Sequence, residues 1–262
     1  MKIGFIGTGF MGSALASAAS KNADNTLYLS NRTVSKAENL AGEIGGTVSS
    51  NAAVVSECDY VFLGVKPNML DDVLDEIGGA LALREGNCVL VTMLAGVKAE
   101  SITDYLKFQC PVIRIMPNIP VMAGEGTILY ACNGEVSRQQ AEDFLSAMKF
   151  AGKFYELDEK LIDAGSAVSG CGPAYAAMFI EALADGGVAC GLPRSVALEL
   201  AAQMTAGSAK LIAEGAMPPS ALKDAVCSPG GTTIQGVRAL EDCGFRGAAM
   251  EAVIAAYEKT VG

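Results

Sequence analysis

Short apolar runs alternate with segments of helical periodicity over roughly the first 155 residues of the chain. The apolar runs predict strands at Ile3–Ile6, Thr26–Ser30, Tyr60–Val65, Cys88–Thr92 and Val112–Met116, with Thr127–Ala131 and Lys153–Tyr155 extending the sheet. The segments between them, such as Phe10–Ser20 and Val34–Gly42, read as helices. Strand and helix in regular alternation predict an α/β domain, with a parallel sheet covered by helices on both faces.

The strand pattern stops after about residue 158, and long apolar segments broken by Gly and Pro follow. They predict helices at Leu161–Ser169, Pro173–Cys190, Arg194–Glu214, Ser220–Ala225, Ile234–Cys243 and Arg246–Lys259. We therefore expect two domains, 1–157 and 158–262, the second all-α. Its abundant Ala and Gly favour close helix–helix packing, within or between chains.

The first predicted strand runs directly into Gly7-Thr8-Gly9-Phe10-Met11-Gly12. In a dinucleotide-binding turn of the Rossmann type, the first glycine makes the tight turn and the second lets a pyrophosphate approach the backbone. The third allows helix and strand to pack closely, and the new helix offers free N–H groups to the phosphates. A plain strand–helix turn is the alternative, but a position between strand and helix favours the cofactor site.

The end of the second predicted strand indicates which dinucleotide is bound. NAD sites place an Asp or Glu there to bind the ribose hydroxyls, whereas this chain has Ser30-Asn31-Arg32-Thr33. Arg32 can form a fork of hydrogen bonds to a 2′-phosphate, and Asn31 and Thr33 can add to it. The pattern favours NADP, unless Arg32 is simply a solvated surface residue.

The amino-acid composition further limits the partners and the reactions that are possible for this chain. A net charge of −10 argues against nucleic acid and anionic membranes as partners. The chain has no histidine, which excludes His-dependent nucleophilic catalysis and His-ligated metals, and we expect no metal site. Hydride transfer is compatible with this lack, because the cofactor carries the chemistry.

Features that bear on location point to the cytoplasm. The eight cysteines form no CxxC pair, which is typical of buried thiols in a reducing compartment. We see no signal peptide at the first residues, and no stretch that reaches the length of a membrane-spanning helix.

A second anion-binding segment is predicted at Ser228-Pro229-Gly230-Gly231-Thr232-Thr233. Flexible residues before a helix expose backbone N–H groups that can hold a carboxylate or phosphate. An ordinary capped helix start would explain the segment as well, although a cap does not need the Gly-Gly pair. Two acidic clusters receive simpler interpretations. Glu181 and Asp185 are expected to pair with Lys210 or Arg194, and the acidic residues between 71 and 76 to form a solvated helix face.

These segments together resemble pyrroline-5-carboxylate reductase from Ile3 to about Tyr257. The most specific stretches are Gly172–Tyr175, Glu181–Gly187, Gly191–Arg194 and Leu222–Asp224 to Ser228–Ile234, supported by Val65–Pro67 and Met116–Pro120. The chain departs from the usual pattern at Cys171, Met217 and Cys227, where Ser, His and Thr are common.

The resemblance implies a Rossmann-type domain followed by an all-α dimerisation domain, with the helices of two subunits interlocked. The active site then lies where one subunit's cofactor domain meets its partner's helices, and dimers commonly assemble into decamers. It implies a cofactor site made by Ile6, Gly7, Thr8, Gly9, Phe10, Met11, Gly12, Asn31, Arg32, Thr33, Asn51, Val65, Lys66, Pro67 and Ala95. Asn51 would lie near the adenosine ribose, and Lys66, Pro67 and Ala95 near the nicotinamide.

The implied substrate site comprises Ser228, Gly230, Gly231, Thr232 and Thr233. Backbone groups from Gly230 to Thr233 would hold the substrate carboxylate, and the Thr233 hydroxyl would reach the ring nitrogen as the catalytic group. The predicted activity is NADPH-dependent reduction of 1-pyrroline-5-carboxylate to L-proline. Two alternatives remain at this point: a β-hydroxyacid dehydrogenase with Lys210 or Lys223 as general base, and an NADP-binding sensor without activity.

Overall fold

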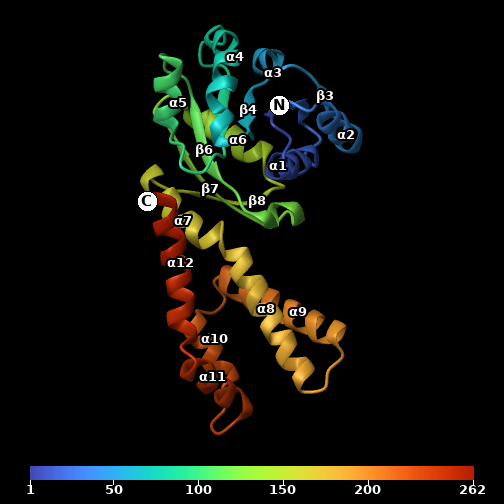
Figure 1. Cartoon of the computed structure of the whole chain (residues 1–262), viewed down its shortest axis with the longest axis vertical. Helices are drawn as coiled ribbons and strands as arrows, with labels where there is room; N and C mark the ends of the chain where they lie inside the picture. The colour runs from blue at the N-terminus through green and yellow to red at the C-terminus, as the bar shows by residue number, and fades with distance from the viewer. The chain divides into compact units, whose positions relative to one another are not determined.

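The computed structural model describes all 262 residues, which form two compact units. The first unit comprises Met1–Gly170 with Tyr257–Gly262, and the second comprises Cys171–Ala256. All strands belong to the first unit, and the second is helical (Figure 1).

The first unit is built on one eight-stranded sheet with the order β3-β2-β1-β4-β5-β6-β7-β8. The strands are β1 (Lys2–Ile6), β2 (Thr26–Ser30), β3 (Thr47–Val48), β4 (Tyr60–Leu63), β5 (Val89–Thr92), β6 (Val112–Met116), β7 (Gly126–Cys132) and β8 (Gly152–Glu156). The chain moves outward from β1 to β2 and β3, then returns to the other side of β1 as β4. A crevice therefore opens at the carboxyl ends of β1 and β4, where α/β proteins bind ligands.

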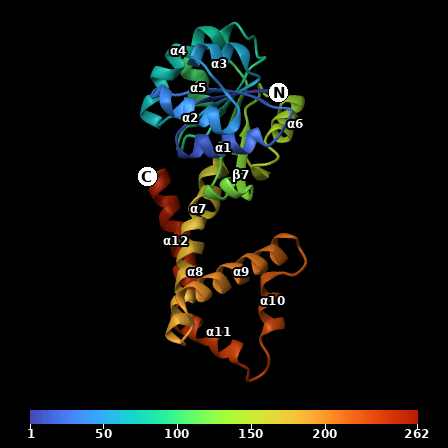
Figure 2. The same ribbon diagram turned by 90° about the vertical axis from the view of Figure 1, so that its right-hand side faces the viewer.

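Alternating side chains of the strands build a separate core on each face of the sheet. Ile3 and Phe5 pack with α1 (Phe10–Ser20), α2 (Val34–Ile44) and α6 (Arg138–Ala147). Val61 and Leu63 face the opposite side and pack with α3 (Asn51–Glu57), α4 (Leu70–Ala82) and α5 (Ala99–Leu106). Figure 2 shows α3 and α4 on one side of the strands and α1 on the other. The strands are consequently buried on both faces, as in other parallel sheets.

Short 3-10 turns complete this unit: η1 (Pro67–Met69), η2 (Ile119–Ala123) and η3 (Glu159–Leu161), the last leading into α7 (Ile162–Ser169). The predicted parallel sheet needs one correction, because β7 runs antiparallel to β6. Only η2 connects these two strands, and so short a link cannot return the chain to the start of a parallel neighbour.

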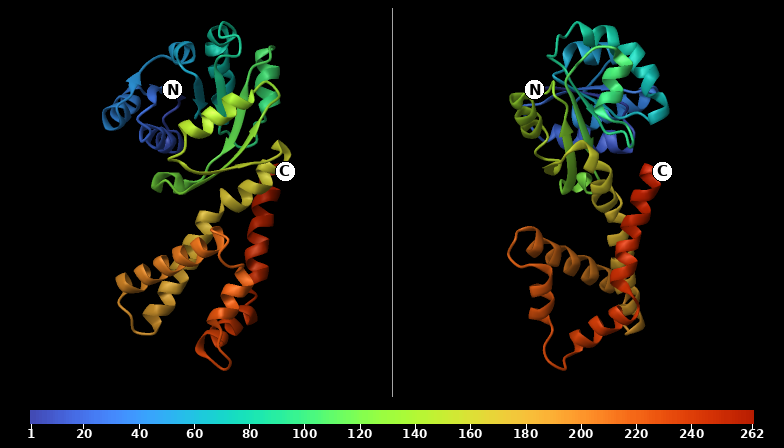
Figure 3. Two further views of the ribbon diagram at one scale, coloured as in Figure 1. Left: turned by 180° about the vertical axis from the view of Figure 1, so that it is seen from behind. Right: turned by 90° about the vertical axis from the view of Figure 1, so that its left-hand side faces the viewer.

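The helical unit contains α8 (Gly172–Ala189), α9 (Arg194–Ala213), α10 (Pro219–Val226) and α11 (Thr232–Asp242), and α12 (Phe245–Val261) begins in it. Small residues bring α8 and α9 together. The buried core of the helical unit consists of Ala184, Ala197 and Ala201, and a Cβ on Gly187 would lie 3.2 Å from the Cβ of Ala197. The predicted pairing of Asp185 with Arg194 is confirmed, whereas Lys210 pairs with Glu214. Figure 3 shows α10 and α11 as separate rods linked by loops.

Large apolar side chains of this unit remain exposed in the single chain. Met178, Leu200 and Met250 are 69%, 57% and 64% exposed, and α10, α11 and α12 have no buried residue. A helical unit of this kind lacks the apolar burial that normally stabilises packed helices. Exposed apolar faces of this kind are typical of surfaces that another chain covers.

The cysteines are partly as predicted. All eight are free thiols, and Cys58, Cys88 and Cys110 are buried, but Cys190 and Cys243 are exposed. The two exposed residues lie just after α8 and α11, whose ends have little around them in the single chain.

Candidate functional site

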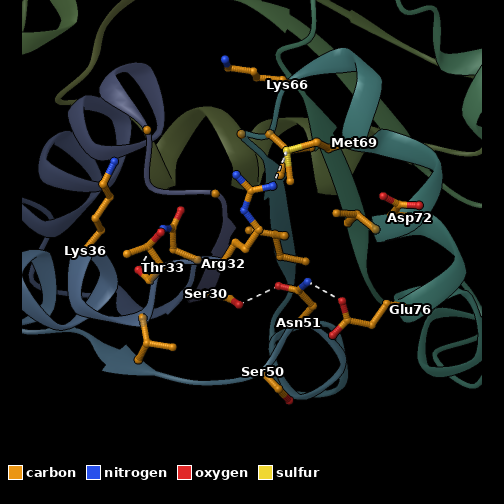
Figure 4. Close-up of a pocket in the computed structure, with 18 of the residues that line it drawn as sticks. Ser30, Arg32, Thr33, Lys36, Ser50, Asn51, Lys66, Met69, Asp72 and Glu76 are labelled. Carbon is orange, nitrogen blue, oxygen red and sulfur yellow. Dashed lines mark hydrogen bonds between the residues drawn. The ribbon is translucent and has the colours of Figure 1, made fainter.

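A cavity of about 760 Å³ lies at the carboxyl ends of β1, β2 and β4, at the crevice that the strand order creates. Its walls come from the loops that follow these strands, from the start of α3 and from one face of α4. Figure 4 shows Arg32, Asn51 and Glu76 among the side chains that line it. Its place in the fold is that of the adenosine half of a dinucleotide site.

Two glycines of the Gly7–Gly12 motif are required by the protein's own packing. Gly7 has φ +98°, and a Cβ there would lie 2.6 Å from the carbonyl oxygen of Gly64. A Cβ on Gly12 would lie 2.3 Å from the carbonyl oxygen of Gly7. Gly64, at the end of the strand that leads to Val65-Lys66-Pro67, is needed for the same reason, since its Cβ would lie 2.5 Å from the carbonyl oxygen of Gly7. These residues let β1, β4 and α1 meet closely.

Gly9 differs from both neighbours in the motif. Its φ of −72° and ψ of −174° are open to any residue, and no atom lies within 4 Å of the Cβ that it lacks. Nothing in the chain therefore requires glycine here. Gly9 lines the cavity at the start of α1, where no side chain caps the free N–H groups of the first turn. The open space above Gly9 fits a pyrophosphate that approaches the backbone and accepts from those groups.

Asn31 holds two loops of the site together. Its Oδ1 accepts from the backbone N–H of Thr8 at 3.1 Å, and its Nδ2 donates to the carbonyl of Thr33 at 3.0 Å. Both ends of the amide are engaged within the protein, and they fix the glycine turn against the loop that carries Arg32. The second N–H of the amide is still free for the predicted contact with a 2′-phosphate.

Three basic side chains line the cavity. Arg32, Lys36 and Lys66 all line it, from the loop after β2, from α2 and from the loop after β4. The Arg32 guanidinium is exposed, and its Nη1 contacts Sδ of Met69 at 3.9 Å. These cations supply local attraction for phosphate groups in a chain whose net charge is negative.

The cavity brings together many of the predicted cofactor residues and leaves others outside. It is lined by Ile6, Gly7, Gly9, Asn31, Arg32, Thr33, Asn51, Val65 and Lys66. Residues outside its lining are Thr8, Phe10, Met11, Gly12, Pro67 and Ala95. Thr8 is buried, and its hydroxyl has no hydrogen-bond partner in the protein. Ala95 is exposed, in the loop that follows β5.

Sequence reasoning missed the contribution of α4. Asp72 and Glu76 line the cavity, and Glu76 accepts a hydrogen bond from Asn51. Both residues are exposed, as a solvated helix face predicts, but they also contribute to the site. They lie four positions apart on a helix that starts 40 residues after Ser30, and no local motif links the two segments. The spacing of the acids on one helix face was the available signal.

The second predicted anion site lies at the start of α11 in the helical unit. Gly230 adopts φ +71°, a left-handed conformation, and the N–H of Gly231 donates to the carbonyl of Ser228 at 3.0 Å. Thr232 is the first helical residue, and α11 has no side-chain cap. The amides of its first turn thus remain open to an anion, whereas that of Gly231 is engaged.

Comparison with known proteins agrees with the site and the fold. Residues 159–262 match a family model described as pyrroline-5-carboxylate reductase dimerisation, and residues 2–96 match one described as NADP oxidoreductase coenzyme F420-dependent. The chain is 38% identical to a pyrroline-5-carboxylate reductase of Pisum sativum, over 98% of this chain and 94% of the relative. It is 37% identical to the enzyme of that name from Escherichia coli (strain K12), over 99% and 97%.

A solved structure extends the similarity to three dimensions. It is a pyrroline carboxylate reductase of Plasmodium falciparum with NADP bound, with a TM-score of 0.87, 31% identity and coverage of 99% of this chain and 97% of that one.

Fold, cavity and comparisons define an oxidoreductase that uses a nicotinamide cofactor, with a Rossmann-type domain followed by a helical dimerisation domain. At this level of identity over nearly the whole length, the chain belongs to the pyrroline-5-carboxylate reductase family.

One expectation about membranes is wrong as stated. The continuous helical stretch Glu159–Ala189 is long and apolar enough to cross a membrane by length and composition, with 11% of its most apolar window buried. The stretch joins η3, α7 and α8. Because the sequence predicted its parts as separate, shorter helices, the full length of the stretch was not recognised. It lies entirely within the match to the dimerisation family, so burial against another chain accounts for its apolar character as well.

Proposed function

We propose that this protein reduces 1-pyrroline-5-carboxylate to L-proline, the final step of proline biosynthesis, with NADPH as the preferred reductant. The observation that carries the proposal is the open space above Gly9 at the start of α1, in a chain 37–38% identical to reductases of that name. Glycine at this position serves a ligand rather than the fold, and the ligand that suits a Rossmann turn is a dinucleotide.

The preference for NADPH rests on Arg32. Its exposed guanidinium lines the cavity just beyond β2, where the 2′-position of the adenosine ribose is bound in Rossmann sites. A guanidinium can donate two parallel hydrogen bonds to a phosphate. Thr33 and Lys36 also line the cavity and add a hydroxyl and a second cation.

The nicotinamide ring, when bound, supplies the hydride that converts the C=N carbon of the substrate into a CH₂ group. The residues proposed to face that ring are Val65, Lys66, Pro67 and Ala95. Since a protonated imine is already electrophilic, the chain needs no strong acid, and the lack of histidine is no obstacle. The contribution of these residues is position and exclusion of water.

The substrate carboxylate is proposed to bind at the start of α11. The free amides of the first helical turn and the hydroxyls of Ser228 and Thr232 offer donors to a carboxylate, and Gly230 shapes the loop. The Thr233 hydroxyl is proposed to form a hydrogen bond with the ring nitrogen of the substrate, whose charge changes when the C=N double bond becomes a single bond.

We propose that residues 1–157 bind the cofactor and that residues 158–262 serve dimerisation and substrate binding. The exposed apolar faces of α8, α9 and α12 fit a second copy of the chain, in agreement with the matched dimerisation family. We further propose that dimers can assemble into decamers, that nucleic acid and membranes are not partners, and that the protein acts in the cytoplasm, where its free thiols stay reduced.

The proposal is tested by following NADPH oxidation at 340 nm with pyrroline-5-carboxylate and identifying the product by chromatography. Proline formed in a one-to-one ratio with oxidised NADPH supports the assignment. Cofactor binding without oxidation would favour a sensor, and turnover of 3-hydroxy acids with Lys210 or Lys223 as base would favour a dehydrogenase. Both lysines already pair with nearby carboxylates, Lys210 with Glu214 and Lys223 with Asp224.

A further inference from the structure

Two carboxylates enter the cofactor cavity from α4, although the end of β2 carries none. Asp72 and Glu76 lie one helical turn apart and both line the cavity. Figure 4 shows the Glu76 side chain directed toward Asn51. The acid that a Rossmann site normally takes from the end of β2 is therefore supplied in this pocket by a different element.

A chain of hydrogen bonds joins Glu76 to the end of β2. The Ser30 hydroxyl donates to Oδ1 of Asn51 at 2.6 Å, and Nδ2 of Asn51 donates to Oε2 of Glu76 at 2.7 Å. Ser30 is the last residue of β2, so Glu76 stands two hydrogen bonds from the position where Rossmann sites hold the adenosine ribose.

The carboxylate of Glu76 also determines which group donates in each of these two hydrogen bonds. An ionised carboxylate only accepts hydrogen bonds, so the NH₂ group of Asn51 must face Glu76 and its oxygen must face Ser30. The Ser30 hydroxyl then has to donate. Only Oε2 of Glu76 takes part, which leaves Oε1 able to accept from a ribose hydroxyl.

The negative charge of Glu76 has no cation of the protein beside it. Arg32 lines the same cavity but contacts Met69, and Glu76 forms no ion pair with it or with any other cation. A carboxylate in this place attracts a ribose 2′-hydroxyl and repels a 2′-phosphate, which is the opposite of what Arg32 does.

We propose that Glu76 is a specificity-determining residue that opposes Arg32, lowers the preference for NADPH and keeps NADH usable as a cofactor. This inference rests on the proposed function, in that the cavity holds the adenosine end of a nicotinamide dinucleotide. It assigns cofactor choice to a balance between two charged residues on different elements.

The test measures binding directly, by titrating the full-length protein with NADPH and NADH and following the fluorescence of the cofactor. The chain contains no tryptophan, so protein emission interferes little. Glu76→Gln keeps the size and an acceptor oxygen for Asn51 but removes the charge. We expect it to raise the ratio Kd(NADH)/Kd(NADPH) by about 3- to 10-fold, as loss of one screened charge predicts. Adenosine 2′,5′-bisphosphate and adenosine 5′-monophosphate, which lack the fluorescent nicotinamide, should show the same shift when their affinities are measured by displacement of NADPH.

Two variants serve as controls. Asp71→Asn removes the same charge from the same helix outside the cavity lining and should leave the ratio within twofold of wild type. Glu76→Asp keeps the charge and should also stay within twofold, which separates charge from shape. An unchanged or lowered ratio in Glu76→Gln, or an equal shift in Asp71→Asn, overturns the inference while wild-type cofactor binding stands. Failure of the wild type to bind either cofactor overturns the proposed function and this inference with it.

Discussion

Replacing Gly9 with alanine separates ligand binding from folding. The backbone at Gly9 is in an extended conformation that alanine adopts readily, and the added Cβ meets no atom of the protein within 4 Å. Alanine also lowers the conformational entropy of the unfolded chain. Gly9 is also the N-cap of α1, a position where alanine is less favourable than glycine, so the two effects oppose each other and the free energy of unfolding should change by less than about 1 kcal/mol.

The same methyl group should weaken cofactor binding strongly. It occupies the space where a pyrophosphate would approach the amides of the first turn of α1, which no side chain caps. Loss of one or two hydrogen bonds to a charged group costs about 2–4 kcal/mol. This corresponds to a roughly 30- to 1,000-fold rise in Kd.

Gly12→Ala is the matched comparison. Its Cβ would lie 2.3 Å from the Gly7 carbonyl oxygen, so α1 must shift, and overpacking of this kind costs about 1–3 kcal/mol of stability. Thermal unfolding followed by circular dichroism, together with NADPH titration, measures both effects. If Gly9→Ala unfolds at a markedly lower temperature, or binds NADPH as the wild type does, glycine at position 9 is not there for a ligand.

Three further predictions concern other parts of the protein. Arg32→Asp should weaken NADPH binding by about 1–3 kcal/mol and spare NADH, and an equal loss for both cofactors would contradict the role of Arg32. Thr233→Ala should lower kcat by about 10- to 100-fold through loss of one transition-state hydrogen bond, and unchanged kinetics would remove Thr233 from the mechanism. Burial raises the pKa of Cys58 and Cys88 to about 12 and that of Cys110 to about 11, so these thiols should resist iodoacetamide at pH 8 until the protein is unfolded by urea. Since the same thiols ionise near pH 9 once unfolded, they should lower the free energy of unfolding as pH rises from 9 toward 12, and a stability that rises across that range would contradict their burial.

Local patterns were sufficient for most of the sheet. The sequence predicted β2 and β6 with the bounds observed, because short runs of Leu, Tyr, Val and Ile stand out from the more polar residues around them. It missed β3, whose two residues are too few to show a pattern, and it did not predict the antiparallel direction of β7. Direction depends on the length of the connection, and the predicted bounds Met116 and Thr127 already left a link too short for the crossover that a parallel neighbour needs.

The site was predictable where it follows one strand end and unpredictable where separate segments meet. The glycine turn and Arg32 belong to a motif with fixed spacing, and both line the cavity. Glu76 reaches the same cavity from α4 by bonding to Asn51, and this contact follows from packing of helices distant in sequence. Asn31 lies where expected, but its amide is used by Thr8 and Thr33, which only coordinates reveal.

The central claim is hydride transfer from a nicotinamide to a cyclic imine on this chain. It is tested most directly by incubating the wild-type protein with pyrroline-5-carboxylate and NADPH deuterated at both C4 positions, then analysing proline by NMR and mass spectrometry. We expect one deuterium per proline, located on the δ-carbon. Oxidation of the cofactor without deuterium in proline, or no proline at all, would contradict the account.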